Sequence, residues 1–143
     1  MASIIRQIAV AASAGAVWDA VRDWAELHTR LVPGIVTSVV AFRDCDPPVR
    51  IVSFADGMVL RERIVGIDDD AMRLVWSIEG APVDHHNGAL QVVRDTDTDG
   101  ARVVWTADVL PDALAAPFGE LMTKGLATMA AHLERLHTQQ PAA

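Results

Sequence analysis

The sequence predicts an α+β domain in which a curved antiparallel sheet wraps around one long C-terminal helix. Apolar and polar residues alternate with period two in most segments between Ile35 and Val109, as in half-buried strands. Short turns rich in Asp, Gly and Pro separate these segments, which is typical of an antiparallel meander. The stretch from about Pro117 to His137 then carries apolar residues three and four positions apart, which predicts an amphipathic helix.

The N-terminal third supplies one more strand and two short helices. Ser3–Val10 is predicted to be a strand, and Ser13 is a favourable N-cap for a first short helix. A second short helix is expected at Glu26–Leu31, before the breaker pair Pro33-Gly34. Six further strands are expected at Ile35–Phe42, Val49–Phe54, Met58–Ile67, Met72–Glu79, His85–Arg94 and Arg102–Val109. Seven strands form too wide a sheet for one helix to cover flat, so we expect the sheet to curl and leave a concavity.

Length and composition indicate a single folded domain at residues 1–138, followed by a frayed tail at 139–143. The net charge of −7 and the single lysine, Lys124, argue against nucleic acid as a partner. No apolar run approaches the roughly 18 residues expected of a membrane span. One cysteine, Cys45, excludes an internal disulfide and fits a cytoplasmic location.

Glu62 is the residue whose chemistry is least expected at its position. In the strand around it, Glu62 shares one face with Leu60 and Ile64, while Arg61 and Arg63 mark the opposite face as solvated. A buried carboxylate is costly unless it is paired, hydrogen-bonded or protonated. An inward Glu62 therefore indicates either a structural ion pair or a wet internal cavity. We expect the cavity, because both neighbouring arginines point outward.

The same alternation brings His86 onto the inner face, together with Trp76, Gly88 and Trp105. A glutamate and a histidine within hydrogen-bonding reach can orient a ligand carbonyl or hydroxyl, or act as an acid–base pair. A structural Glu–His or Glu–Arg pair across strands is the alternative. The tryptophans fill a core by default, and Trp76 could also stack on a planar ligand.

Several patterns that resemble metal sites lack the necessary geometry. His85 and His86 are neighbours in a strand and point to opposite faces. His132 and His137 are five apart on a helix, whereas the zinc-protease pattern needs four. The acidic run 95–100 begins like a calcium loop but lacks the closing glutamate and helical flanks. We therefore expect no metal and no cofactor.

The order and spacing of short motifs resemble the START-like superfamily, also called SRPBCC or birch-pollen-allergen-like. The matching segments are Val17-Trp18, Val21 and Trp24, Pro33-Gly34, Leu60-Arg61-Glu62-Arg63-Ile64 with Asp68, Pro82-Val83, and Val104-Trp105-Thr106-Ala107-Asp108 with Pro111. The resemblance spans nearly the whole chain and is closest to the bacterial polyketide cyclase/dehydrase-like branch. It implies the helix-grip fold, with an internal cavity between the sheet and the C-terminal helix.

Two groups within this superfamily bear on the site. In plant hormone receptors the cavity-facing Glu, an aromatic, a Tyr and a Ser fall on Glu62, Trp76, His86 and Gly88. The receptor lysine that anchors a carboxylate falls near the apolar Leu31. In aromatase/cyclase members an inward Arg is implicated in ring closure, whereas Arg61 and Arg63 are expected on the outer face here.

The prediction for function is binding of a small, mostly hydrophobic, lipid- or polyketide-like molecule. One alternative is a polyketide cyclase, aromatase or dehydratase with Glu62 and His86 as catalytic residues, and another is a protein-interaction module that uses the same groove. The oligomeric state is left as monomer or homodimer. The residues expected to line the cavity are Glu62, His86, Trp76, Met58, Leu31, Gly88, Phe118, Met122, Leu126, Met129 and Trp105.

Overall fold

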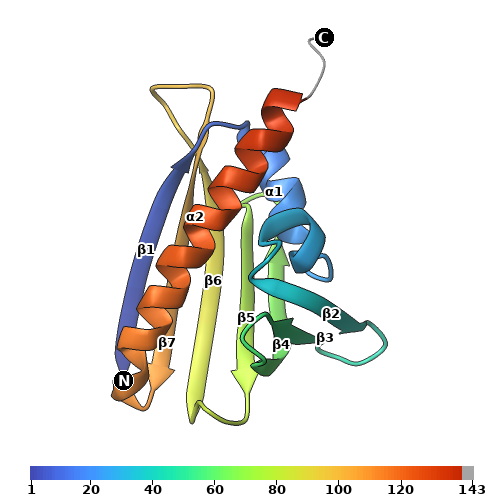
Figure 1. Ribbon diagram of the computed structural model, residues 1–143, viewed down its shortest axis with the longest axis vertical. Helices are drawn as coiled ribbons and strands as arrows, with labels where there is room; N and C mark the ends of the chain where they lie inside the picture. Colours follow the sequence, from blue (N-terminus) through green and yellow to red (C-terminus); the bar gives the residue numbers. More distant parts are fainter. Residues whose placement is uncertain (140–143) are drawn as a thin grey trace.

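The computed structural model describes residues 1–139 and contains the predicted strands in one antiparallel sheet (Figure 1). Each strand boundary lies within one residue of its expected position. The strands are β1 (Ala2–Val10), β2 (Val36–Phe42), β3 (Val49–Phe54), β4 (Val59–Asp68), β5 (Arg73–Glu79), β6 (His85–Arg94) and β7 (Ala101–Leu110). Most of the expected tail, residues 140–143, lies outside the described residues, and Gln139 is the last residue of the C-terminal helix.

Within residues 1–139, four helical segments accompany the sheet. They are the α-helices α1 (Ala14–Arg22) and α2 (Ala115–Gln139), the π-helical turn η1 (Leu27–Leu31) and the 3₁₀ turn η2 (Asp112–Leu114). Helix α2 begins two residues before the predicted Pro117, because a proline is tolerated in the first turn of a helix. Within residues 1–139 no helix is long and apolar enough to cross a membrane.

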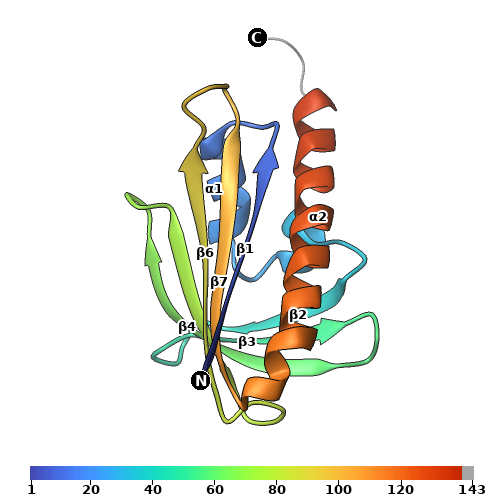
Figure 2. The ribbon, with the colours of Figure 1, turned by 90° about the vertical axis from the view of Figure 1, so that its left-hand side faces the viewer.

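The strands follow the order β1-β7-β6-β5-β4-β3-β2, so β1 and β2 form the two edges of the sheet. Helix α1 and η1 carry the chain from one edge strand to the other. A bulge in β4 between Ile64 and Gly66 shifts its register against β5, and bulges bend the strands that carry them. Figure 2 shows β2 and β3 turned across the direction of β1, β6 and β7, which confirms the predicted curvature.

Helix α2 crosses the concave side of this sheet and packs along β1 and η1 (Figures 1 and 2). Its buried residues include Met122, Leu126, Met129 and Leu133, which recur at three- and four-residue spacings. Gly125 allows a close approach to the sheet, because a Cβ there would lie 2.9 Å from the Trp105 ring. The helix therefore lies directly against the β7 tryptophan.

Helix α1 is tied to the turn between β4 and β5. Trp18 Nε1 donates to Asp69 Oδ1 at 2.9 Å, and Arg22 Nε donates to the same oxygen at 2.8 Å. These hydrogen bonds lower the pKa of Asp69, with the bond from Arg22 contributing most. The contact holds α1 across one end of the sheet and leaves the middle of the concavity to be closed by η1 and α2.

Candidate functional site

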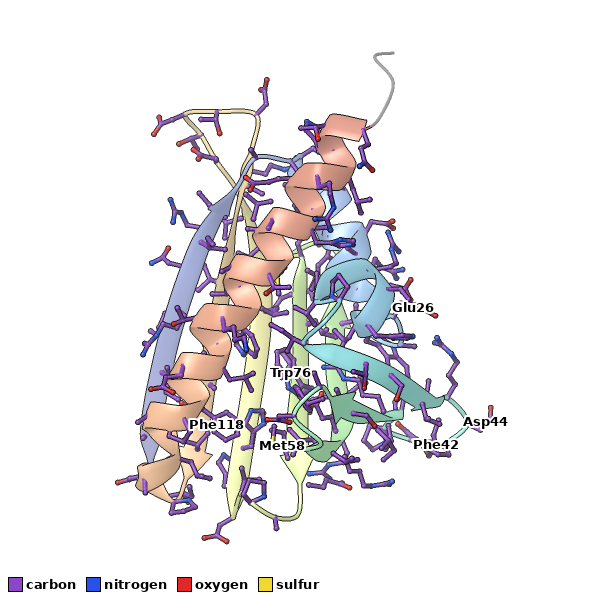
Figure 3. The ribbon with its side chains drawn as sticks, viewed as in Figure 1. Glu26, Phe42, Asp44, Met58, Trp76 and Phe118 are labelled. Atoms are coloured by element: carbon purple, nitrogen blue, oxygen red, sulfur yellow. The ribbon has the colours of Figure 1, made fainter. Side chains whose placement is uncertain are left out.

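A cavity lies between the concave face of the sheet, η1 and helix α2. The space open to water-sized molecules amounts to about 70 Å³, which is enough for a few waters. Its wall is mostly apolar, and its three ionisable side chains, Arg50, Glu62 and His86, lie close together around Ile78, in a part of the wall that we call the polar end. Figure 3 shows Trp76 on β5 and Phe118 on α2, which line this region from opposite sides.

Glu62 is buried, as its position in the alternating strand predicted, and its partner is Arg50. The two residues lie directly opposite each other on β4 and β3, and Arg50 Nε donates to Glu62 Oε1 at 2.7 Å. Arg50 is only 2% exposed and Glu62 only 4% exposed. Because both charges are withdrawn from water together, each neutralises the other inside the wall.

The Arg50 guanidinium also joins the sheet to the segment between α1 and η1. Its Nη1 donates to the Trp24 carbonyl oxygen at 2.9 Å, and its Cζ lies 5.4 Å from the centre of the Trp76 ring. The carbonyl supplies a second acceptor, and the ring face supplies a favourable cation–π contact. Arg50 is thus held on three sides by Glu62, Trp24 and Trp76.

His86 takes the place of a missing backbone hydrogen bond between β5 and β6. The register between these strands ends at Trp76 and Gly88, and beyond that point the Ile78 amide donates to His86 Nδ1 at 3.1 Å. Because Nδ1 is an acceptor, the proton of the neutral ring resides on Nε2. The His86 ring centre lies 6.4 Å from that of Trp76 and 5.7 Å from that of Phe118.

The pKa of His86 is lowered to about 4, chiefly by burial and to a smaller extent by the neighbouring charge of His85. The carboxylate of Asp108 acts in the opposite direction but does not reverse the shift. The imidazole is therefore neutral at pH 7 and presents an N–H donor. Within residues 1–139 its hydrogen bonds use Nδ1 and the backbone carbonyl, and none uses Nε2.

Gly88 makes room for the two aromatic rings on the inner face. A Cβ at this position would lie 2.9 Å from His86 Cε1, 3.2 Å from His86 Nε2 and 3.1 Å from Trp76 Cε2. Any side chain would displace one ring or the other. The absence of a side chain at Gly88 therefore lets the His86 and Trp76 rings pack closely against β6.

Trp105 completes the aromatic part of the wall. Its ring centre lies 5.9 Å from that of Trp76, at an interplanar angle of 57°. Its Nε1 is buried and has no hydrogen-bond partner within the described residues. A buried donor without a partner costs about 1–3 kcal/mol, so an acceptor supplied from outside the chain would be favourable there.

The structure places the expected site residues in two groups. Those in the cavity wall are Glu62, His86, Trp76, Leu31, Phe118, Met129 and Trp105. The remaining four, Met58, Gly88, Met122 and Leu126, lie behind it or beside it. Met122 packs into the core near β1 and β7, Leu126 belongs to the main core, and Met58 packs against a separate cluster.

Glu62 and His86 were expected to contact each other, but each binds a different partner. Ile78 on β5 lies opposite Glu62 on β4, and its backbone amide binds the His86 ring on the other side. Glu62 pairs with Arg50 instead, and this pair realises the alternative of a Glu–Arg bond across strands.

Among residues 1–139, thirteen lining residues were not among the expected site residues, and Arg50 is the most important of them. Period-two alternation gave a usable signal, because it places Arg50 on the face of Val52 and Phe54. The residues that complete the wall are Leu27, Val32, Ile35, Val36, Arg50, Val52, Phe54, Leu60, Leu74, Ile78, Leu90, Leu121 and Gly125. Among residues 1–139 no three His, Cys, Asp or Glu side chains gather closely enough to hold a metal ion.

Over residues 1–139 the sequence matches the family described as polyketide cyclase/dehydrase and lipid transport. The chain belongs to this family. The match and the helix-grip architecture confirm the resemblance seen in the sequence motifs. No protein among the curated sequences matches the chain significantly.

Solved structures share this family member's fold. A Thermobifida fusca protein solved by NMR is 28% identical, with a TM-score of 0.76 and full coverage of both chains. XoxI from Bacillus cereus is 22% identical, with a TM-score of 0.83 over 96% of this chain and 99% of its own. Norcoclaurine synthase from Thalictrum flavum, in complex with dopamine and hydroxybenzaldehyde, is 19% identical, with a TM-score of 0.70 over 99% and 89%. At these identities the last two show the fold alone.

Removal of one member of the buried ion pair should be far more damaging than removal of an exposed one. We expect Arg50→Met to lower the free energy of unfolding by about 3 kcal/mol, because it leaves the Glu62 carboxylate buried without a counter-charge. The double variant Arg50→Met/Glu62→Leu should recover much of that loss. Urea denaturation measures both. The matched control is Arg61→Met, which breaks an exposed pair with Glu79 and should cost less than about 1 kcal/mol. Additive losses in the double variant would contradict this account.

Gly88→Ala should destabilise the protein by about 1–3 kcal/mol, because the new methyl group meets the His86 and Trp76 rings. Gly66→Ala is the control, since no atom lies within 4 Å of a Cβ built there. Thermal denaturation of the two variants provides the comparison. Equal stability of both would show that the rings yield freely.

The lowered pKa of His86 should make stability fall as the pH drops from 7 to 4.5. Between the ordinary pKa of about 6.5 and the native value of about 4, only the unfolded chain binds the proton, so stability rises with pH there. At pH 4.5 the loss attributable to this ring is about 2.5 kcal/mol. Urea denaturation of wild type and His86→Phe at both pH values isolates it, since the other groups are common to both. Parallel losses in the two proteins would refute it.

Proposed function

We propose that the protein binds a small, mostly apolar molecule in the cavity between the sheet and helix α2. The observation that carries this proposal is the wall itself, where aliphatic and aromatic side chains surround the space and a few polar groups meet it at one end. That combination is the usual form of a small-molecule site, in which apolar walls supply affinity and isolated polar groups fix orientation.

The relatives support the same proposal. The family is described as including lipid transport as well as polyketide cyclases and dehydrases. Norcoclaurine synthase, of the same fold, was solved with the small aromatic molecules dopamine and hydroxybenzaldehyde. An aromatic or lipid-like guest is consistent with a wall that contains Trp76, Trp105 and Phe118.

The bonding of the polar residues favours recognition over proton transfer. Glu62 already accepts a hydrogen bond from Arg50, and His86 Nδ1 already accepts one from Ile78. The free ring nitrogen of His86 carries the proton, so the neutral ring is a donor and has no lone pair for use as a base. These groups are poised to orient a guest and to balance charge around it.

A neutral apolar probe should bind the cavity and stabilise the fold. We expect N-phenyl-1-naphthylamine at ten times its dissociation constant to raise the midpoint of thermal unfolding by about 4 °C. Fluorescence titration gives the dissociation constant, and the probe should be recovered unchanged. Leu121→Trp, which fills the wall from α2, should weaken binding at least tenfold, whereas Val65→Trp on the outer face should not.

Native mass spectrometry of protein from its own host provides an independent test of the same proposal. A small molecule that co-purifies with wild type and is depleted in Leu121→Trp would support it and reveal the chemistry of the guest. No bound molecule, together with a probe that leaves the unfolding midpoint unchanged, would contradict it.

A further inference from the structure

We infer that the cavity selects an uncharged guest with a hydrogen-bond acceptor, such as a ketone, aldehyde or ester, over the carboxylate of the same shape. This inference rests on the proposed function and concerns the polar end of the same site. It follows from two features of the wall, namely the balance of its charges and the identity of its free donor.

The charges at the polar end already cancel. Among residues 1–139, Arg50 is the one cationic side chain in the cavity wall, and its guanidinium is engaged by Glu62 at 2.7 Å and by the Trp24 carbonyl at 2.9 Å. A guest carboxylate would place a second anion beside Glu62 around a single cation. That arrangement leaves one negative charge buried without compensation, which a wall of aliphatic and aromatic side chains cannot solvate.

His86 cannot supply the missing positive charge at neutral pH. With a pKa of about 4, only about one ring in a thousand is protonated at pH 7. The charge of the neighbouring His85 disfavours protonation of His86, whereas the Asp108 carboxylate favours it. The ring therefore meets a guest as a neutral donor.

The donor itself is fixed in position. The Ile78 amide holds Nδ1 at 3.1 Å and thereby sets the tautomer, while Nε2 lies over the inner face above Gly88. A carbonyl oxygen would accept from this N–H without introducing charge. The indole N–H of Trp105, buried in the same wall without a partner in the described residues, adds a second unused donor.

Three ligands of nearly equal shape test the inference, namely acetophenone, α-methylstyrene and benzoate. They place a carbonyl, a methylene and a carboxylate on the same ring. By NMR titration at pH 7, we expect acetophenone to bind about tenfold tighter than α-methylstyrene, as one hydrogen bond to a buried donor provides. Benzoate should bind at least tenfold more weakly than acetophenone.

A matched pair of variants locates the effect. His86→Phe retains an aromatic ring but removes the fixed donor, so the tenfold preference for acetophenone over α-methylstyrene should fall severalfold, with any remainder supplied by the Trp105 indole N–H. Phe118→Leu alters the wall but removes no donor, so both affinities should change while their ratio is kept. Should His86→Phe fail to fold, the imidazole Nε2–H resonance of wild type gives the same information. It should shift on addition of acetophenone and stay in place with α-methylstyrene.

The outcomes separate the inference from the proposed function. Binding of α-methylstyrene together with equal or tighter binding of benzoate would overturn the inference and leave the cavity as a binding site. Equal affinity of wild type for the ketone and the hydrocarbon would also overturn it. Failure of all three ligands and of N-phenyl-1-naphthylamine to bind would remove the proposed function and the inference with it.

Discussion

Two opposite charges meet inside the concave face of the sheet, where Arg50 on β3 lies directly opposite Glu62 on β4. Their hydrogen bond needs the observed register, because a slip of one residue would turn either side chain to the outer face. The guanidinium also reaches the Trp24 carbonyl, so it links the far half of the sheet to the segment that precedes η1. This buried pair therefore depends on the strand register, holds the segment that precedes η1, and places both charges in the cavity wall.

Between β5 and β6, a hydrogen bond to a side chain takes the place of one between backbones. Past Trp76 and Gly88 the ladder between β5 and β6 opens, and the His86 ring accepts the Ile78 amide in place of a carbonyl. The backbone amide remains satisfied, which a buried donor requires. At the same time the opening turns an aromatic N–H donor toward the inner face. One imidazole therefore satisfies the Ile78 amide and also presents an N–H donor on the inner face.

The local patterns in the sequence carried most of the fold and only part of the site. Strand positions followed from alternation and turn residues, and the inward position of Glu62 followed from the alternation of its own strand. The partner of Glu62 depended on the register between β3 and β4, and the partner of His86 on the point where β5 and β6 separate. Neither is encoded within a single strand.

For helix α2, too, the sequence predicted the apolar stripe but not which part of it meets the cavity. Its apolar stripe was evident, but the stripe is wider than the part that faces the cavity. Leu121 and Gly125 line the space, whereas Met122 and Leu126, one residue further on, rest in the core. The edge of the stripe that meets the cavity is set by the path of α2 over the sheet. That path depends on the close contact of Gly125 with Trp105.

The two sides of the cavity are held by different forces, and this difference bears on how it can adapt. Arg50, Glu62 and His86 lie on strands joined to their neighbours by hydrogen-bonded ladders. Helix α2 contacts the sheet through packed side chains, with the Glu134 carboxylate accepting from the Ala11 amide at 2.8 Å. Small-molecule pockets commonly reach about 300–1,000 Å³, several times the present space. For a guest of that size, the helix side is the side that can yield without breaking backbone hydrogen bonds between strands. The polar end would then keep its geometry while the apolar wall moves to fit.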